Sequence, residues 1–160
     1  IRLSLVGSEM CIRDRSKDTI FTEEFYELPK INDASALIAK WDRIRAMRSD
    51  ITKAIEFERE AGNVGSSLQA ELQIEAPATD AALLKSLGDD LKFITITSSV
   101  NVTENSSLEE IKVTVKSSSH QKCGRCWHYR DDVGHDAEHP TLCGRCTSNL
   151  FGDGEKRHIA

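Results

Sequence analysis

Long apolar runs are missing from this 160-residue sequence. No stretch approaches the roughly 20 apolar residues that a membrane-spanning helix needs, so we expect no membrane partner. Basic residues are also in short supply, because the formal net charge is −5. This balance argues against a protein that coats nucleic acid indiscriminately, which requires a broad basic surface.

Cysteine is scarce outside two short motifs, which hold four of the five cysteines. Such sparse use favours a reducing, cytoplasmic compartment over a secreted disulfide scaffold. With 39% hydrophobic and 29% charged residues, the composition is that of a globular chain with one medium domain or two small ones.

Charge is unevenly distributed along the chain. Residues 61–120 carry 4 basic and 8 acidic side chains, whereas residues 121–160 carry 6 of each. Any contact with nucleic acid should therefore be local, and should involve the predicted helix and the cysteine-containing region rather than the middle of the chain.

The two motifs, Cys123–Cys126 and Cys143–Cys146, both read Cys-Gly-Arg-Cys, with sixteen residues between the inner cysteines. A two-residue gap allows both sulfurs of a pair to face one point, and we expect Gly124 and Gly144 to permit the tight turn. Two such pairs can close a tetrahedron around one zinc ion. The predicted zinc ligands are Cys123, Cys126, Cys143 and Cys146.

We interpret this zinc site as structural, because four cysteines leave no open position for water or substrate. Two disulfides or a dithiol redox site are the alternatives, but a redox site explains neither the duplication nor the spacing. Nearby side chains could compete as ligands or offset the −2 charge of the zinc–thiolate cluster. The candidate competitors are His128, His135 and His139, and the candidate counter-charges are Lys122, Arg125 and Arg145.

Residues 1–15 differ from the rest of the sequence and resemble translated adapter sequence, so we expect them to be non-native and Cys11 to be unrelated to the metal site. An aromatic, extended connector follows over residues 17–31. From about Ala34 to Ala61, an amphipathic helix is predicted, which ends at Gly62. Its apolar stripe comprises Leu37, Trp41, Ile44, Ile51 and Ile55, with Arg48 on the same stripe, either packed along its stem or held to meet a phosphate.

The middle of the chain predicts a small mixed sheet. Alternation indicates strands over residues 68–76, 93–97 and 111–115, with a helix of leucines between the first two and a polar loop over 101–107. Ser117–Ser119 is predicted to be a hinge. This order of elements, followed by a zinc module, indicates an α+β fold.

Three motifs give the chain from Thr19 onward a resemblance to the C-terminal part of bacterial-type isoleucyl-tRNA synthetases. The helix from Trp41 to Glu56 resembles the last helix of the anticodon-binding domain, and the turn at 64–70 resembles the one that follows it. The cysteine module resembles the terminal zinc module, which distinguishes the isoleucine enzymes from the valine and leucine enzymes. The motif residues are Cys123, Cys126, Trp127, His128, Val133, Gly134, Glu138, His139, Cys143–Cys146, Asn149 and Gly152–Arg157.

We expect boundaries of 1–15 for the non-native stretch, 16–63 for the connector and the last helix of the anticodon-binding domain, 64–119 for a small α+β junction domain and 120–160 for the zinc module and tail. The family resemblance implies a monomeric ligase that attaches isoleucine to its tRNA with ATP, through isoleucyl-adenylate and with editing of valine. The ATP-site signatures His-Ile-Gly-His and Lys-Met-Ser-Lys-Ser are absent, so no catalytic residue is expected here and an upstream catalytic domain is implied.

What remains is expected to face the anticodon stem-loop. Unpaired bases stack on aromatic or guanidinium planes, and phosphates are held by Arg and Lys. The candidate RNA-binding residues are Arg48, Arg125, Trp127, Tyr129, Arg145, Lys156 and Arg157.

Two alternatives remain open. One is the zinc-finger end of a DNA-repair glycosylase, which does not explain the helix, the glycine-serine turn or the tail. The other is a free-standing zinc-ribbon interaction module, which requires residues 16–120 to fold alone.

Overall fold

The computed structural model describes residues 27–30 and 32–155. The adapter-like stretch 1–15, most of the aromatic connector, Lys156 and Arg157 lie outside the described residues. The chain divides into two compact units, 1–34 and 35–160. In the first unit, residues 27–30 form no regular secondary structure, and a turn at 32–33 precedes the helix that begins at Ala34. Across the described ranges, no helix has the length and apolar character to cross a membrane.

The long helix is confirmed as α2, Ala34–Glu60. Its buried stripe consists of Ile44, Met47, Ile51 and Ile55, spaced so that each lies about one turn from the next. Met47 takes the place that the predicted stripe gave to Arg48, while Leu37 is 47% exposed and lies outside the core. The stop at Gly62 is also confirmed, because its φ of +79° is the left-handed conformation that ends helices.

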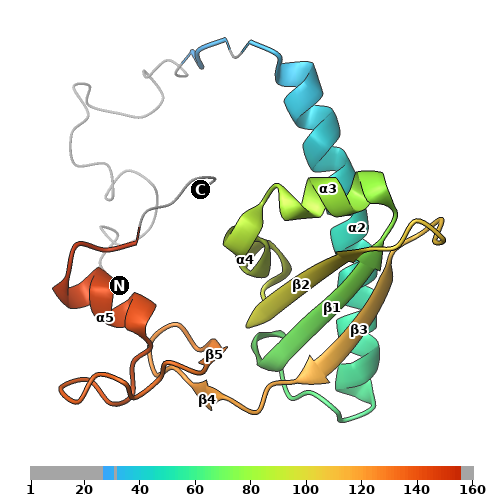
Figure 1. The fold of residues 1–160 in the computed structure, drawn as a ribbon. Helices are drawn as coiled ribbons and strands as arrows, with labels where there is room; N and C mark the ends of the chain where they lie inside the picture. Colours follow the sequence, from blue (N-terminus) through green and yellow to red (C-terminus); the bar gives the residue numbers. More distant parts are fainter. Residues whose placement is uncertain (1–26, 31, 156–160) are drawn as a thin grey trace, which may run out of the picture. The chain divides into compact units, whose positions relative to one another are not determined.

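Strands β1, Ala70–Ala76, β2, Ser99–Glu104, and β3, Lys112–Ser117, form a sheet in the order β2-β1-β3 (Figure 1). β1 runs parallel to β2 and antiparallel to β3. The register aligns Leu72 with a valine on each side, and Ile74 likewise. One face of the sheet is therefore apolar, and the other presents the polar side chains that alternate with these residues.

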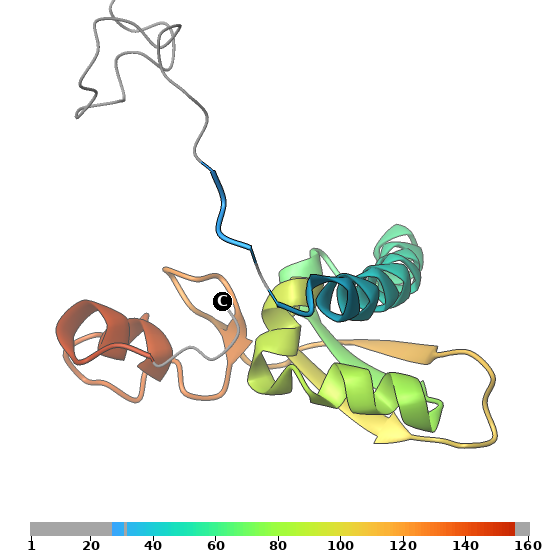
Figure 2. The ribbon, with the colours of Figure 1, turned by 90° about the horizontal axis from the view of Figure 1, so that it is seen from above.

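The parallel pairing of β1 and β2 requires a crossover, which is formed by α3, Ala78–Lys85, the short 3-10 turn η4, Gly88–Asp90, and α4, Leu91–Thr95. Figures 1 and 2 show α2 alongside the sheet and α3 with α4 next to the β2 edge. Leu84, Leu87 and Leu91 of this crossover join the core that contains Ile74 and α2.

One buried carboxylate joins two of these helices. Asp80 of α3 is 4% exposed, and its oxygens accept hydrogen bonds from Nε of Arg43 on α2 at 2.9 Å and from its terminal nitrogen at 2.5 Å. A bidentate pair of this kind fixes the angle between two helices as well as their separation. Asp80 therefore ties α3 to α2.

The strand predicted over 93–97 is wrong, because this segment contains α4 and its left-handed end at Ile96, where φ is 56°. The Phe-Ile-Thr-Ile-Thr alternation favours a strand, but the buried Thr95 hydroxyl bonds the Leu91 carbonyl at 3.0 Å and the Thr97 hydroxyl at 2.8 Å. These hydrogen bonds satisfy the buried hydroxyl groups of both threonines at the end of α4. Tertiary packing thus overrides a local strand preference.

Two further expectations need correction. Residues 101–104 are part of β2, not loop, because Val100 and Val102 pair with β1 while the polar residues between them face outward. Ser117–Ser119 is not a free hinge. β3 ends at Ser117, and the backbone N–H of buried Ser118 donates to the Gln69 carbonyl in η3, Ser67–Gln69, at 2.8 Å.

The remaining described residues form the zinc module, residues 121–155. It contains a two-stranded hairpin of β4, Gln121–Lys122, and β5, Tyr129–Arg130, followed by α5, Gly144–Phe151. The α+β class and the cysteine-containing module at its end are confirmed.

Candidate metal centre

The four predicted ligands meet at one point. The sulfurs of Cys123, Cys126, Cys143 and Cys146 lie within 4.8 Å of one another, and all four cysteines are unpaired. Sγ of Cys126 is 3.7 Å from Sγ of Cys143, whereas a disulfide would bring two sulfurs to about 2 Å. Tetrahedral zinc with Zn–S bonds near 2.3 Å places its sulfurs about 3.8 Å apart. The donor set and its spacing therefore fit zinc and exclude disulfides among these cysteines.

The first cysteine pair lies in the turn between β4 and β5. The N–H of Cys123 donates to the His128 carbonyl at 2.9 Å, and the N–H of Trp127 donates to the Cys123 carbonyl at 3.0 Å. The left-handed residue of this turn is Trp127, with φ of 65°. Gly124 does not adopt a left-handed conformation, so the expectation that this glycine permits the tight turn is wrong.

The second pair lies at the start of α5, where Cys143 precedes the first helical residue and Cys146 lies in the first turn. Gly144 does not adopt a left-handed conformation either. Its N–H donates to Oδ2 of Asp132 at 3.0 Å, and Asp132 also accepts a bond from Nε of Arg130 at 3.1 Å. The helical turn, rather than glycine, brings these two sulfurs together.

The glycines of the module are expected to respond differently to alanine. A Cβ on Gly124 would meet nothing closer than 3.5 Å, so Gly124→Ala should leave zinc affinity and thermal stability unchanged. Gly134 has φ of +85°, and a Cβ there would lie 3.1 Å from the Pro140 carbonyl oxygen. Gly134→Ala should therefore lower the free energy of unfolding by about 1–2 kcal/mol. Thermal unfolding of the two zinc-loaded variants checks this, and equal losses would contradict it.

The thiols have very different proton affinities without metal. Burial favours the neutral thiol, but N–H groups of Cys126, Cys143 and Arg125 donate to Cys123 and lower its pKa to about 6. Burial and the neighbouring sulfurs raise the pKa of Cys143 to about 12. Four adjacent thiolates therefore require a cation at neutral pH, and zinc supplies the charge that makes all four anionic.

One arginine is placed to offset the thiolate charge. A terminal nitrogen of Arg125 lies 3.7 Å from Sγ of Cys146. A guanidinium beside a zinc–thiolate cluster reduces the net negative charge, as the sequence suggested for this residue.

The histidines do not enter the sulfur cluster, whose members within the described part of the chain are all cysteines. Nδ1 of His128 lies 3.2 Å from the Cys126 carbonyl. Burial, together with nearby basic groups, lowers the pKa of His128, so the ring is neutral at pH 7 and donates this bond. His139 instead stacks on Phe151, with ring centroids 3.9 Å apart.

Two of the candidate RNA-binding residues differ strongly in exposure. Trp127 is 58% exposed, and Nζ of Lys122 lies 5.3 Å from its ring centroid. Tyr129 is half-buried, and its N–H donates to Oγ of Ser98 at 2.6 Å. Trp127 thus presents an open aromatic face beside a cation, whereas the backbone of Tyr129 attaches the module to the sheet.

The candidate arginines make internal contacts. Nε of Arg48 donates to the Ile94 carbonyl of α4 at 2.7 Å, although the side chain is exposed. Arg145 forms a bidentate pair with Glu155 at 2.5 and 2.7 Å, and its guanidinium carbon lies 4.8 Å from the Phe93 ring centroid. Both arginines therefore hold elements together, in addition to any role toward a ligand.

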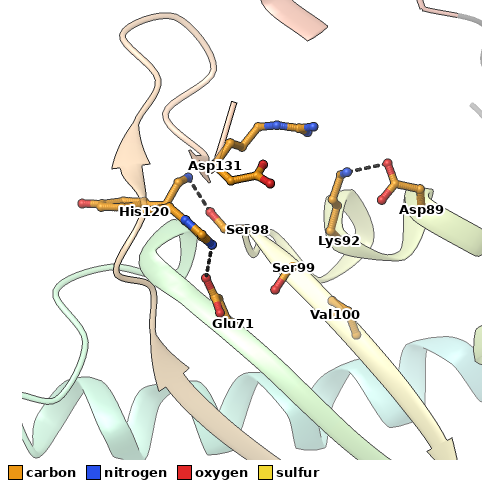
Figure 3. A pocket seen from close by; sticks show the side chains of 10 residues that line it. Glu71, Asp89, Lys92, Ser98, Ser99, Val100, His120 and Asp131 are labelled. Carbon is orange, nitrogen blue, oxygen red and sulfur yellow. Dashed lines mark hydrogen bonds and ion pairs between the residues drawn. The ribbon is translucent and has the colours of Figure 1, made fainter. Parts of the chain in front are cut away.

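Sequence reasoning missed the residues that join the module to the sheet. A cavity of about 280 Å³ lies at this junction, and Ser98, Lys92 and His120 are among the residues that line it (Figure 3). Within this lining, Nζ of Lys92 pairs with Asp89, and Nε2 of His120 lies 3.9 Å from a carboxylate oxygen of Glu71. No local signal marks these residues, because they come from segments far apart in the sequence.

Comparison with known proteins supports the assignment of the four cysteines to a zinc-binding site. The zinc-finger family described as "Zinc finger found in FPG and IleRS" matches residues 121–149. This match and the four-cysteine cluster both support a structural zinc ion as the cofactor.

The similarity extends well beyond the finger. The chain is 54% identical over 142 residues, 89% of its length, to the isoleucine–tRNA ligase of Janthinobacterium sp. (strain Marseille). It is 54% identical over 149 residues, 93% of its length, to that of Paraburkholderia xenovorans, and 52% identical over 143 residues to that of Cupriavidus taiwanensis. The resemblance drawn from the motifs is confirmed. The chain spans 15% or 16% of the length of these curated relatives.

Proposed function

We propose that this chain is the RNA-facing, C-terminal part of an isoleucine–tRNA ligase. The observation that carries the proposal is identity above 50% to isoleucine–tRNA ligases over nine-tenths of the chain. The full protein would attach isoleucine to its tRNA with ATP, through isoleucyl-adenylate and with editing of valine. None of that chemistry requires residues of this chain, so its contribution is to bind RNA.

The zinc finger alone does not select this function, because its description names both FPG and IleRS. The glycosylase alternative therefore shares the finger, but it does not account for α2 or the sheet. The long similarity includes these elements, since it covers at least 89% of the chain. The ligase is accordingly the function that fits the whole chain.

We propose that Cys123, Cys126, Cys143 and Cys146 hold one zinc ion, whose role is to stiffen the module. A segment of about forty residues has too small a core to fold alone, so metal binding supplies the missing stability. Cys123, Cys143 and Cys146 are all 0% exposed and Cys126 is half-buried, and four cysteine ligands would leave no open coordination position for a substrate. The proposed domain boundaries remain 16–63, 64–119 and 120–160.

The proposed RNA partner is the anticodon stem-loop of isoleucine tRNA. Trp127 is the strongest candidate contact, because it combines an exposed indole with a neighbouring ammonium group. Arg48 and Arg125 are exposed candidates, whereas Tyr129 and Arg145 act mainly through their contacts inside the chain. Lys156 and Arg157 are proposed as further cationic contacts. We propose a monomeric, cytoplasmic full-length enzyme.

Binding of the zinc-loaded chain to synthetic stem-loops tests the proposal. We expect the isoleucine anticodon stem-loop to bind at least tenfold more tightly than a valine stem-loop of equal length, measured by fluorescence anisotropy at fixed salt. Trp127→Ala should weaken the cognate complex by about 1–3 kcal/mol, the usual contribution of base–aromatic stacking. Thr114→Ala, at an exposed residue of β3 outside the proposed RNA-facing surfaces, is the control. Equal binding of both stem-loops would contradict the proposal.

A further inference from the structure

Two side chains of the zinc module contact the same ring in the rest of the unit, that of Phe93. Phe93 lies in the middle of the five-residue helix α4. Its ring meets His128 edge to face, with centroids 5.5 Å apart and planes at 77°. On the same ring, the Arg145 guanidinium carbon lies 4.8 Å from the centroid.

These two partners come from the two halves of the metal centre. His128 follows the first cysteine pair by two residues, and Arg145 lies inside the second pair. A single side chain from α4 therefore contacts residues next to or within both cysteine pairs. Aromatic and cation–ring contacts of this kind are directional, so they set an orientation as well as a distance.

Arg145 and His128, the two partners of the Phe93 ring, are each held in place by contacts within the zinc module. Arg145 is fixed by the bidentate pair with Glu155, whose N–H donates to Oδ1 of Asn149 at 2.8 Å. His128 is fixed by the bond between Nδ1 and the Cys126 carbonyl. The surfaces that clamp Phe93 are thus pre-organised by the module rather than shaped by the ring.

The other side of α4 is attached to α2. Nε of Arg48 donates to the Ile94 carbonyl, one residue from Phe93. Beyond the helix, Oγ of Ser98 accepts the Tyr129 N–H and donates to the Leu68 carbonyl at 2.5 Å, and Figure 3 shows this Ser98 contact beside the cavity. α4 therefore contacts both α2, through Arg48, and the zinc module, through Phe93.

We propose that Phe93 is a positioning residue that sets the orientation of the zinc module relative to the sheet and α2. This inference rests on the proposed function in one respect: correct orientation brings the exposed surfaces of α2 and of the module to one RNA. Two linked surfaces bind a common partner more tightly when their relative placement is fixed in advance. Phe93 would then contribute to RNA affinity without touching RNA.

Amide residual dipolar couplings of the zinc-loaded 160-residue chain test the orientation directly, without RNA. In the unmodified chain, couplings from the sheet and from α5 should fit a single alignment tensor. Phe93→Ala should retain one zinc per chain but require two tensors, and Phe93→Leu, which preserves an apolar side chain without a ring, should do the same. Phe93→Tyr should restore the single tensor. A single tensor in both Phe93→Ala and Phe93→Leu would overturn the proposal.

Binding of the isoleucine anticodon stem-loop provides the second measurement. Loss of the ring contacts should raise Kd about tenfold in Phe93→Ala. Thr114→Ala, at an exposed residue of β3 outside both proposed RNA-facing surfaces, should leave Kd unchanged. An unchanged Kd in Phe93→Ala would remove the functional part of the inference. If the unmodified chain binds no stem-loop, the proposed function fails, and the dipolar couplings still decide whether Phe93 positions the module.

Discussion

Replacing Cys143 with serine is expected to abolish zinc binding and, with it, the folded structure of the zinc module. The Cys143 sulfur is 0% exposed and forms part of the cluster in which all four sulfurs lie within 4.8 Å. A hydroxyl is a poor replacement for a thiolate, so zinc affinity should fall by more than the 10–100-fold that a lost outer-shell contact costs. Structural zinc sites contribute about 10–16 kcal/mol of apparent binding free energy, which the module would lose.

Metal analysis and amide hydrogen exchange measure the two effects separately. The unmodified chain should hold one zinc, whereas Cys143→Ser should hold none at the same free zinc concentration and should lose amide protection across residues 121–155. Cys11→Ser is the matched control, because Cys11 lies outside both cysteine motifs. Full zinc occupancy in Cys143→Ser, or equal loss in both variants, would refute the four-cysteine site.

Truncation of Ile74 should produce the largest loss of stability outside the metal centre. Ile74 is 0% exposed and lies in the central strand, with Val102 and Val113 opposite it on either side. Removing a buried isoleucine side chain down to alanine typically costs 2–5 kcal/mol, through lost burial and the cavity that remains. Ile74→Ala should therefore lower the free energy of unfolding of the α+β part by about that amount.

The matched control is Ile38→Ala, which removes the same atoms from a residue that is 57% exposed on α2. Alanine is also the better helix former, so the stability of this variant should change by about 0.5 kcal/mol or less. Urea unfolding followed by far-UV circular dichroism compares the two under saturating zinc. Similar losses in both variants would show that Ile74 does not lie at the centre of the core.

Some features of the chain follow from residues close together in sequence. The ligand type and the two-residue spacing within each pair predict a thiolate metal site, since only a few residues separate the donors. The apolar periodicity from Ala34 onward predicts α2, and the glycine at position 62 predicts its end. Both signals are local, because each involves residues within a few turns of one helix. Motif resemblance likewise requires no tertiary information, and it led to the same family that the relatives name.

Other features depended on contacts between distant segments. The alternation over 93–97 is as compatible with a strand as with a short helix, and packing of Leu91 and Thr95 in the core selects the helix. The parallel pairing of β1 with β2 then shifts the strand to Ser99–Glu104. Within the metal centre, the left-handed residue is Trp127 rather than either glycine, which the cysteine spacing does not reveal.

The amino-acid sequence by itself determined that this chain has a four-thiolate zinc site and a long amphipathic helix, because donor chemistry and helical periodicity are local properties. Only the tertiary structure decided how the metal site is attached to that helix. The attachment runs through Phe93, which contacts His128, and through Ser98, which accepts a hydrogen bond from Tyr129. Ser98 and Tyr129 are 31 residues apart in the chain. Contacts at such separations are set by the packing of the whole unit, and no local pattern encodes them.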